Sequence, residues 1–365
     1  MADTLHHGFH GVRDLRKLKD GMENLAIFDG HNDLLSCLLA EGDRDGASFI
    51  TGRQGDIDLA KCRAGGFAGG FFAIWGRVEP GTGPDSNATC RAFPAIDEGR
   101  AAREIAAQIA ILLRLTTAHP DAIRLCRSAA EITTARAAGA IAAILHLEGA
   151  EGIGADLDAL HLYHAAGLRA LGPVWSRPNR FGHGVPFNHP ASPDTGPGLT
   201  GHGKRLVREC DALGILVDLS HLNEAGFWDV AATSDRPLVA THSNAHAMTA
   251  ATRNLTDRQL AAMAERGGLA GLNYGCGFLR PDGLKNPDTP PEDLIRHLDH
   301  LIGKLGEGGV ALGSDFDGTM IPDFIGTAAG LPKLVEAMRV AGYGAPLIRR
   351  LCWDNWLDLI RRTIG

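Results

Sequence analysis

Apolar residues recur along this chain in eight short runs that are rich in Val, Ile, Leu, Ala, Phe or Gly. The runs cover residues 24–32, 67–75, 140–148, 168–175, 214–221, 237–242, 268–274 and 309–315. Some contain continuous apolar stretches, as at 140–145 and 214–217, rather than alternating ones. Continuous runs are typical of strands that are buried on both faces of a parallel sheet. The pattern therefore predicts eight buried parallel strands.

Helical periodicity fills several of the intervals between these runs. Residues 98–115 repeat Ala, Ile and Leu at helical spacing beside charged residues. Residues 256–266 form a second such pattern, for which Asn254 is the predicted N-cap and Gly267 marks the end. Eight strands followed by helices, in a chain of 365 residues, favour an α/β fold of the (β/α)8 barrel type. A doubly wound sheet is the alternative.

No internal repeat or shift of composition divides the chain, so one domain over residues 1–365 is expected. The longest irregular stretch, residues 175–203, contains five Pro and six Gly and follows the fourth predicted strand. Barrels place substrate loops at such positions. We interpret this stretch as an active-site loop.

Charge and cysteine content narrow the functional classes. The net charge of -7 disfavours a nucleic-acid partner, and the first 25 residues contain no apolar run long enough for a signal peptide or membrane span. We therefore expect a cytoplasmic protein. Its seven cysteines are scattered and form no CxxC motif, so unpaired thiols are expected rather than a disulfide framework. A homodimer is left open.

The first predicted strand ends with a pair of residue types that bind metals. His31 and Asp33 are two residues apart, so their side chains would point to the same face of a strand. Imidazole and carboxylate together suit a divalent ion such as zinc. Taken alone, Asp33 could instead cap a turn.

Four further strand ends carry similar residue types, which makes a metal-binding role for His31 and Asp33 the favoured interpretation. The residues in question are His146 and Glu148, Asp218 and His221, His242, and Asp315 with Asp317. The carboxyl ends of barrel strands meet at one face, where the chemistry of such enzymes takes place. We expect these side chains to converge there.

The number of donors indicates two metal ions rather than one. The donors are His31, Asp33, Glu148, His221 and His242, and one catalytic zinc usually takes about three protein ligands. In a two-zinc site the ions lie about 3.5 to 4 Å apart, and Glu148 has the two oxygens needed to bridge them. Water between the ions would ionise near pH ~7. Hydrolysis by metal-bound hydroxide is the expected chemistry.

These motifs, in this order, resemble the membrane dipeptidase (renal dipeptidase) family of metallopeptidases, in the form of a bacterial-type member. The resemblance covers nearly the whole chain and rests on Asp29-Gly30-His31-Asn32-Asp33-Leu34, Glu148-Gly149, Asp218-Leu219-Ser220-His221, Ser243, Arg253-Asn254, His297-Leu298-Asp299-His300 and Gly313-Ser314-Asp315-Phe316-Asp317-Gly318. It implies the five zinc ligands named above, with Glu148 bridging. It also implies that Asp315 transfers a proton to the leaving amine and that Arg253 holds the substrate carboxylate.

The resemblance fails at one position of the family pattern. Mammalian members have a Thr-His-Ser after the fourth strand, whose His polarises the scissile carbonyl, whereas this chain has Trp175 in place of that His. His183 and His189 are substitutes, although a loop hydrogen-bonding role is the simpler interpretation for each. We predict that Trp175 and Asn273 contact the substrate. The secretory leader and membrane-anchoring tail of the mammalian enzymes are also absent, which fits a cytoplasmic relative.

Several charged residues have simpler interpretations than a place in the site. Asp317 followed by glycine is typical of a turn, and Arg177 and Arg180 are expected on a solvated face of the long loop. His246 reads as an ordinary polar residue, and His146 is kept outside the ligand set.

The sequence thus predicts a two-zinc dipeptidase that cleaves small dipeptides, with L-Xaa-D-Xaa as an expected substrate. The rival within enzymes is another amidohydrolase-type hydrolase, acting on N-acyl amino acids, lactones or cyclic amides. A metal protein that binds a peptide without hydrolysing it is the rival from another class.

Overall fold

The structure is a computed structural model that describes residues 25–78 and 93–365. Cys90 and the first 24 residues, in which no leader is predicted, lie outside these ranges. In the described ranges no helix has the length and apolar character needed to cross a membrane. The six cysteines there are unpaired, and five of them are buried.

The described residues contain nine β-strands. The strands are β1 (Ile27–Asn32), β2 (Phe67–Ile74), β3 (Ile123–Leu125), β4 (Ile141–Glu148), β5 (Leu168–Gly172), β6 (Leu216–Val217), β7 (Val239–Ala240), β8 (Leu269–Leu272) and β9 (Val310–Leu312). Eight of them lie in the eight predicted runs. The sequence analysis missed β3, which pairs with the first residues of β4 and lies off the main strand order.

Parallel pairing arranges the other strands in a ring. One sheet has the order β1-β2-β4-β5-β6 and the other has the order β7-β8-β9. A parallel bridge between Asp218 and Val239 joins the end of β6 to β7, and a bridge between Asn32 and Phe316 joins β1 to the segment that follows β9. The predicted (β/α)8 barrel is confirmed, although two of its eight neighbour contacts are single bridges rather than ladders.

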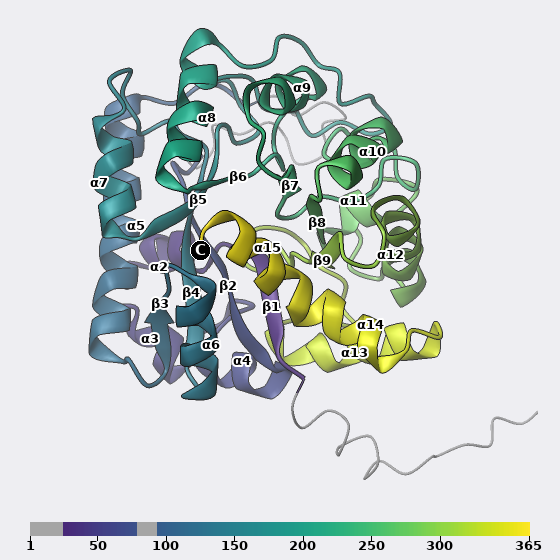
Figure 1. Cartoon of the computed structure of the whole chain (residues 1–365). Helices are drawn as coiled ribbons and strands as arrows, with labels where there is room; N and C mark the ends of the chain where they lie inside the picture. Colours follow the sequence, from purple (N-terminus) through teal and green to yellow (C-terminus); the bar gives the residue numbers. More distant parts are fainter. Residues whose placement is uncertain (1–24, 79–92) are drawn as a thin grey trace, which may run out of the picture.

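Helices surround this ring and cover one end of it (Figure 1). They are α2 (Leu34–Glu41), α3 (Ala47–Thr51), α4 (Leu59–Gly65), α5 (Glu98–Ala118), α6 (Ala129–Ala137), α7 (Asp158–Ala166), α8 (Gly201–Leu213), α9 (Glu224–Thr233), α10 (Asp257–Glu265), α11 (Cys276–Leu279), α12 (Pro291–Leu305), α13 (Leu331–Val340), α14 (Ala345–Arg349) and α15 (Asn355–Thr363), with short helical turns η1 (Ala328–Gly330) and η2 (Arg350–Asp354). Both helices predicted from periodicity are present, as α5 and α10.

The predicted N-cap of α10 is wrong. Thr256 caps this helix, because its hydroxyl accepts from the backbone N–H of Gln259 while the Gln259 side chain accepts from the Thr256 N–H. This reciprocal pair is a capping box, which satisfies two donors at once. The Asn254 amide instead donates to the backbone carbonyls of Thr249 and Phe278.

The apolar core forms two layers. The larger layer lies between the strands and the surrounding helices, and the smaller one fills the ring and is covered by η2 and α15. Trp356 of α15 is fully buried and packs at 6.3 Å from the ring of Phe28, with its indole N–H on the carbonyl of Leu312. A Cβ at Gly30 would collide with Trp356 and with the Thr241 carbonyl. Only glycine leaves room for the indole at this point of the strand.

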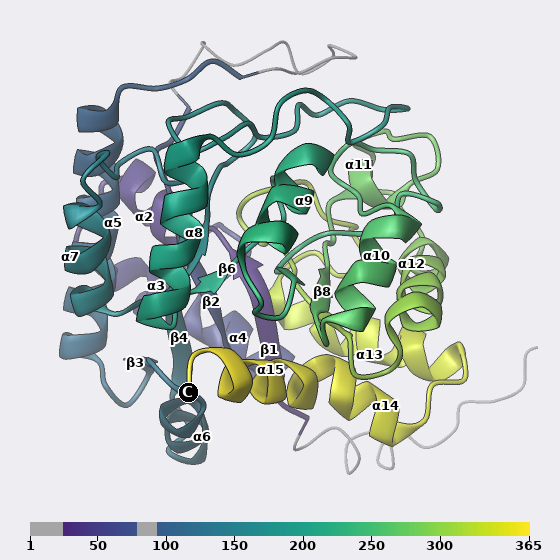
Figure 2. The same cartoon turned by 45° about the horizontal axis from the view of Figure 1, so that its top comes forward.

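Helix α15 therefore covers the amino ends of the strands, as the first residues of β6, β7 and β8 belong to the same inner layer. The opposite ends of the strands point toward the long loop, and residues 175–200 are indeed irregular up to the start of α8 (Figure 2).

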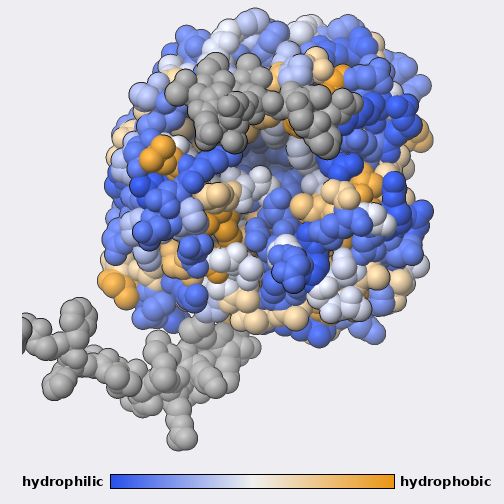
Figure 3. Space-filling model, turned by 180° about the vertical axis from the view of Figure 1, so that it is seen from behind, coloured by the Kyte–Doolittle hydropathy of each residue, from blue (hydrophilic) through white to orange (hydrophobic). Residues whose placement is uncertain are grey.

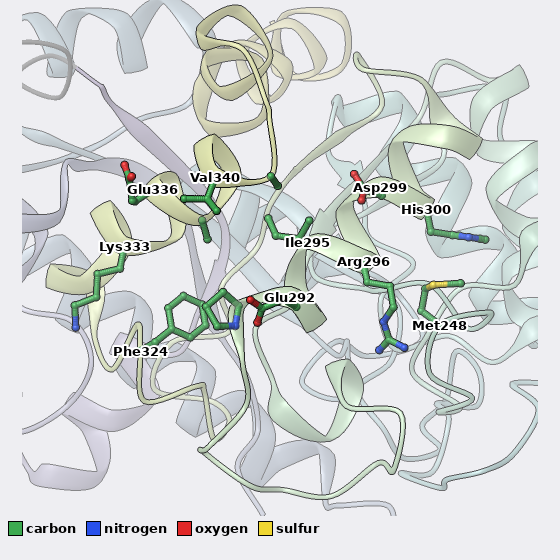
Figure 4. Close-up of a pocket in the computed structure, with 13 residues that line it drawn as sticks. Met248, Glu292, Ile295, Arg296, Asp299, His300, Phe324, Lys333, Glu336 and Val340 are labelled. Atoms are coloured by element: carbon green, nitrogen blue, oxygen red, sulfur yellow. The ribbon is translucent and has the colours of Figure 1, made fainter. Parts of the chain in front are cut away.

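The face of the molecule shown in Figure 3 mixes hydrophilic residues with smaller groups of hydrophobic ones. A groove of about 830 Å³ runs outside the barrel between α12 and α13, with Ile295 and Val340 among the residues that line it (Figure 4). Every residue predicted to bind metal or substrate lies elsewhere. The groove is therefore not the candidate site.

Candidate active site

His31 and Asp33 come together as predicted, although not as members of one strand. Strand β1 ends at Asn32, and Asp33 is the residue that precedes α2. Its carboxylate Oδ2 lies 3.5 Å from His31 Nε2. The chain turns at this point because Asp33 donates its backbone N–H to the carbonyl of Phe316, beyond β9. The pair is thus held by two barrel segments.

Glu148, the last residue of β4, lies at the centre of the cluster. Its Oε1 is 3.6 Å from His31 Nε2, 2.8 Å from His221 Nε2 and 3.4 Å from His242 Nε2. The two imidazole nitrogens of His221 and His242 are 3.1 Å apart, and the ring of His31 stacks on His242 at 3.8 Å. All five predicted donors therefore converge at the carboxyl ends of the strands.

The cluster contains buried polar atoms that lack protein partners. Both nitrogens of His31 and the Oδ1 of Asp33 have no hydrogen bond within the described part of the chain, and each residue is at most 5% exposed. An unpartnered buried polar atom is costly, so such atoms usually mark a bound group. Two groups of donors lie close enough to share an ion, His31 with Glu148 and His242, and His31 with Asp33 and Asp315.

Outer hydrogen bonds orient the two histidines that face Glu148. The Thr241 hydroxyl donates to Asp218 Oδ2 at 2.7 Å, so it can only accept at 2.8 Å from His242 Nδ1. That places the proton on Nδ1 and leaves the Nε2 lone pair pointing inward. The Ser176 hydroxyl lies 2.8 Å from His221 Nδ1 and holds that ring by its outer nitrogen.

The sequence analysis quoted Asp218 in a motif but gave it no role. Its carboxylate also accepts from the backbone N–H of Thr241 and from both the N–H and the hydroxyl of Ser220. Asp218 thus fixes the segments that carry His221 and His242. The signal that could have revealed it is a carboxylate directly after an apolar strand, which needs several donors when buried.

Burial and neighbouring charges shift the pKa values of the three histidine donors, two of them downward and one upward. Burial, reinforced by the nearby Arg253 guanidinium and by His31, lowers the pKa of His221 and His242 well below the usual range, so both are neutral as ligands must be. Burial alone would lower the pKa of His31, but the charges of Glu148 and Asp33 raise it to about 10. The carboxylates therefore attract positive charge to this point.

Asp315 follows β9 and closes the cluster from the opposite side. Its backbone N–H donates to the His31 carbonyl, and its Oδ2 accepts from the Asn273 amide at 2.9 Å. Burial raises the pKa of Asp315 to about 6. Asn273 is fully buried after β8 and orients Asp315 through this hydrogen bond.

Arg253 is buried beside the cluster instead of being solvated. Its terminal nitrogens donate to the carbonyls of Ser220 and His242 and to the Ser243 hydroxyl, and one lies 3.4 Å from His221 Nε2. Its Nε has no partner among the described residues. A fixed guanidinium with an unused donor is suited to an anionic group.

Trp175 forms an aromatic wall next to His221. The two rings are 5.9 Å apart, and Trp75 stacks on the other side of Trp175 at 5.1 Å. The prediction of a solvated Arg177 is wrong, because this side chain is fully buried under Trp175, with its guanidinium 4.9 Å from the indole and paired with Glu151 at 2.7 Å. Burial without this carboxylate would be prohibitive.

Other residues considered earlier have structural partners outside the cluster. His183 Nδ1 lies 3.3 Å from the Gly198 carbonyl, His246 Nε2 lies 2.9 Å from the Ala191 carbonyl, and Arg180 pairs with Glu98 at the surface. His189 packs against Gly283. His146 lies near the cluster, with its ring 5.4 Å from that of His31.

Comparison with known proteins agrees with this geometry. Residues 15–364 match the family model described as membrane dipeptidase (peptidase family M19). The crystal structure of dipeptidase AC, a metallopeptidase of that family, is 51% identical, with a TM-score of 0.89 over 94% of this chain and 99% of its own. A metallopeptidase from Rhodobacter sphaeroides, liganded with a phosphinate mimic of the dipeptide L-Ala-D-Ala, is 50% identical, with a TM-score of 0.90 over 93% of this chain and 99% of its own.

An uncharacterized protein in the pqqA 5′ region of Klebsiella pneumoniae is 47% identical over 256 residues, which is 70% of this chain and 94% of that protein. The family match spans almost the entire sequence, and both solved relatives share the barrel described above. The chain therefore belongs to the membrane dipeptidase family and is a metallo-dipeptidase.

Proposed function

We propose that the protein is a binuclear zinc dipeptidase that hydrolyses small dipeptides with an L residue followed by a D residue. The observation that carries this proposal is the convergence of three imidazole nitrogens around Glu148 Oε1, with Asp33 beside one of them and buried polar atoms left unpaired. The dipeptide mimic bound by the Rhodobacter sphaeroides relative supports the substrate class.

The proposed ligands divide into two sets that share Glu148. His31 and Asp33 would hold one ion, and His221 with His242 would hold the other. Nitrogen and carboxylate donors of this kind suit zinc. When bound, two such ions polarise the scissile carbonyl and make a water nucleophilic near pH ~7.

The residues around these ligands would manage protons and orientation. Asp315 lies within reach of His31 and Asp33, so its carboxylate can take a proton during attack and return it to the departing amine. Asn273 holds the Oδ2 of Asp315 by a hydrogen bond, which fixes the direction of that transfer. Trp175, beside His221, would exclude water and contact an apolar part of the dipeptide.

Arg253 would bind the free carboxylate at the end of the dipeptide. The test compares hydrolysis of L-Ala-D-Ala with that of L-Ala-D-Ala amide, which lacks this charge. Losing a charge-assisted hydrogen bond costs roughly 1.5 to 3 kcal/mol, so kcat/KM should fall by about one to two orders of magnitude for the amide. Arg253→Met should reduce cleavage of the acid by a similar factor and narrow the difference between the two substrates.

Arg180→Met is the matched control, since Arg180 is an exposed loop arginine paired with Glu98. It should cleave both substrates like the unaltered protein. Equal kcat/KM for L-Ala-D-Ala and its amide would contradict the proposal that Arg253 binds the free carboxylate. That result, together with turnover of N-acyl amino acids or lactones, would favour the broader amidohydrolase activity instead.

A further inference from the structure

The turn that carries Asp315 has an unusual backbone. Asp315 and Asp317 have φ angles of 62° and 65°, in the left-handed region that side-chain-bearing residues rarely adopt. The next residue, Gly318, lies so close to the carboxylates of Asp33 and Asp315 that a Cβ there would collide with both. A turn in this conformation needs external contacts to hold it.

Those contacts come from a distant part of the sequence. Arg53, on the segment between α3 and α4, places its Nη1 2.5 Å from Asp317 Oδ2. Asp56 and Asp317 exchange two further hydrogen bonds, from the Asp56 N–H to Asp317 Oδ1 at 2.6 Å and from the Asp317 N–H to Asp56 Oδ2 at 2.9 Å. The side chains of Arg53 and Asp317 are each 4% exposed. The ion pair between Arg53 and Asp317 is therefore shielded from water. Ion pairs that are exposed to water contribute little to stability.

Arg53 is itself fixed on its other sides. Its Nη2 pairs with Glu41 at 2.5 Å, its Nη1 also donates to the Ile57 carbonyl, and its own carbonyl accepts from Lys61. The guanidinium is planar and binds in fixed directions. It thus transfers the rigidity of the segment around α3 and α4 to the turn after β9.

We propose that Arg53 is a positioning residue for Asp315, acting through Asp317 to hold the turn that aims the Asp315 carboxylate at His31 and Asp33. The inference rests on the proposed role of Asp315 in proton transfer. Arg53 does not touch the cluster itself. A displacement of about 1 Å at a reacting group can cost about 10²-fold in rate, so a remote clamp on this turn is sufficient to change turnover.

The test is a double-mutant cycle on hydrolysis of L-Ala-D-Ala by the metal-loaded protein. Arg53→Met should lower kcat by about 10- to 10²-fold, with little change in KM and in metal content. Arg53→Lys keeps the charge facing Asp317 and should restore part of the loss. In the Asp315→Asn background, Arg53→Met should cause no further loss, because the group that it positions is already gone.

Arg266→Met is the matched control. Arg266 is a half-buried arginine that donates to the carbonyls of Ala231 and Ser234, away from the cluster, and its replacement should affect thermal stability without affecting kcat. Asp317→Asn removes the carboxylate that pairs with Arg53. This variant replaces Arg53→Met in the test if Arg53→Met does not fold.

If Arg53→Met lowered kcat by the same factor in the Asp315→Asn variant as in the unaltered protein, the positioning role would be overturned. An unchanged kcat in Arg53→Met or in Asp317→Asn would overturn it as well. Full turnover by Asp315→Asn alone would instead overturn the proton-transfer role on which the inference rests. The two failures are therefore distinguishable.

Discussion

The two ends of the barrel are filled by different kinds of side chain, apolar at one end and polar at the other. At the amino ends of the strands, Phe28, Trp356 and their neighbours form an apolar layer, and the indole N–H of Trp356 is satisfied by the Leu312 carbonyl. At the carboxyl ends, buried histidines and carboxylates crowd around Glu148, and several of their polar atoms have no partner within the described ranges. One end is closed by apolar packing, whereas the other keeps buried polar atoms without hydrogen-bond partners.

The difference indicates where stability and where function are located. A layer that is closed by packing contributes to folding through buried area and close contact. A layer with unpaired polar atoms lowers stability unless a ligand completes it. Substitutions at the two ends should therefore separate turnover from stability, and three experiments test that separation, beginning with the largest expected effect on turnover.

Glu148→Gln should have the largest effect, because it keeps the size of the side chain while removing the charge shared by both proposed ions. We expect bound metal to fall below the two equivalents predicted for the unaltered protein, and turnover to be lost with it. Elemental analysis after reconstitution with zinc, followed by a dipeptide assay, measures both quantities. Full activity at unchanged metal content would rule out the bridging role.

Glu104→Gln provides the control for that experiment. Glu104 is a partly buried carboxylate on α5 that pairs with Arg77 and Arg100 and lies outside the donor set. This variant should retain both metal and activity.

The second experiment concerns pH. Burial raises the pKa of Asp315 to about 6, and the proposed reaction needs the carboxylate form to accept a proton. Turnover should therefore decline as pH falls through about 6, or at a lower pH when bound cations stabilise the carboxylate. Asp315→Asn should lower kcat by about 10² to 10⁴-fold and remove this acid limb while keeping the metal. An unchanged acid limb in that variant would assign it to another group.

The third experiment addresses the opposite end, where the smallest effect on turnover is expected. Trp356→Ala removes the largest fully buried side chain, and such a change typically costs about 3 to 5 kcal/mol of unfolding free energy. Urea denaturation measures this loss, and kcat at 25 °C under native conditions should stay within about twofold. A large drop of kcat in the folded variant would show that the two ends are coupled.

The strands were predictable because burial on both faces leaves continuous apolar runs. Strand β3 has only three residues, one of them Arg124, and it pairs along one edge. It therefore produces no continuous apolar run in the sequence. Strands β6 and β7 have two residues each, since the ring is completed there by a single bridge. Hydrophobic pattern indicates where a strand lies, whereas its length depends on pairing between distant segments.

The donor cluster was predictable for a different reason. Ligand-type residues after apolar strands meet at one face in any barrel, so their convergence follows from the fold. The burial of Arg177 was not predictable, because it depends on Glu151 and on the stack of Trp75 and Trp175. The link from Arg53 to Asp317 joins residues 264 positions apart, and no local pattern records it. The capping box at Thr256 was visible in the sequence and was overlooked.

The barrel has two weak joints, and two of the proposed ligands lie on opposite sides of one of them. Single bridges connect β6 to β7 and β9 to β1. His221 and His242 follow the two strands of the joint between β6 and β7, whereas the joint between β9 and β1 has the proposed ligand His31 in β1 and the proton-transfer residue Asp315 after β9. An ion bound by His221 and His242 would cross-link the two sheets where a single backbone bridge joins them. Metal loading would then hold this joint together, so that the protein without its ions opens first between β6 and β7.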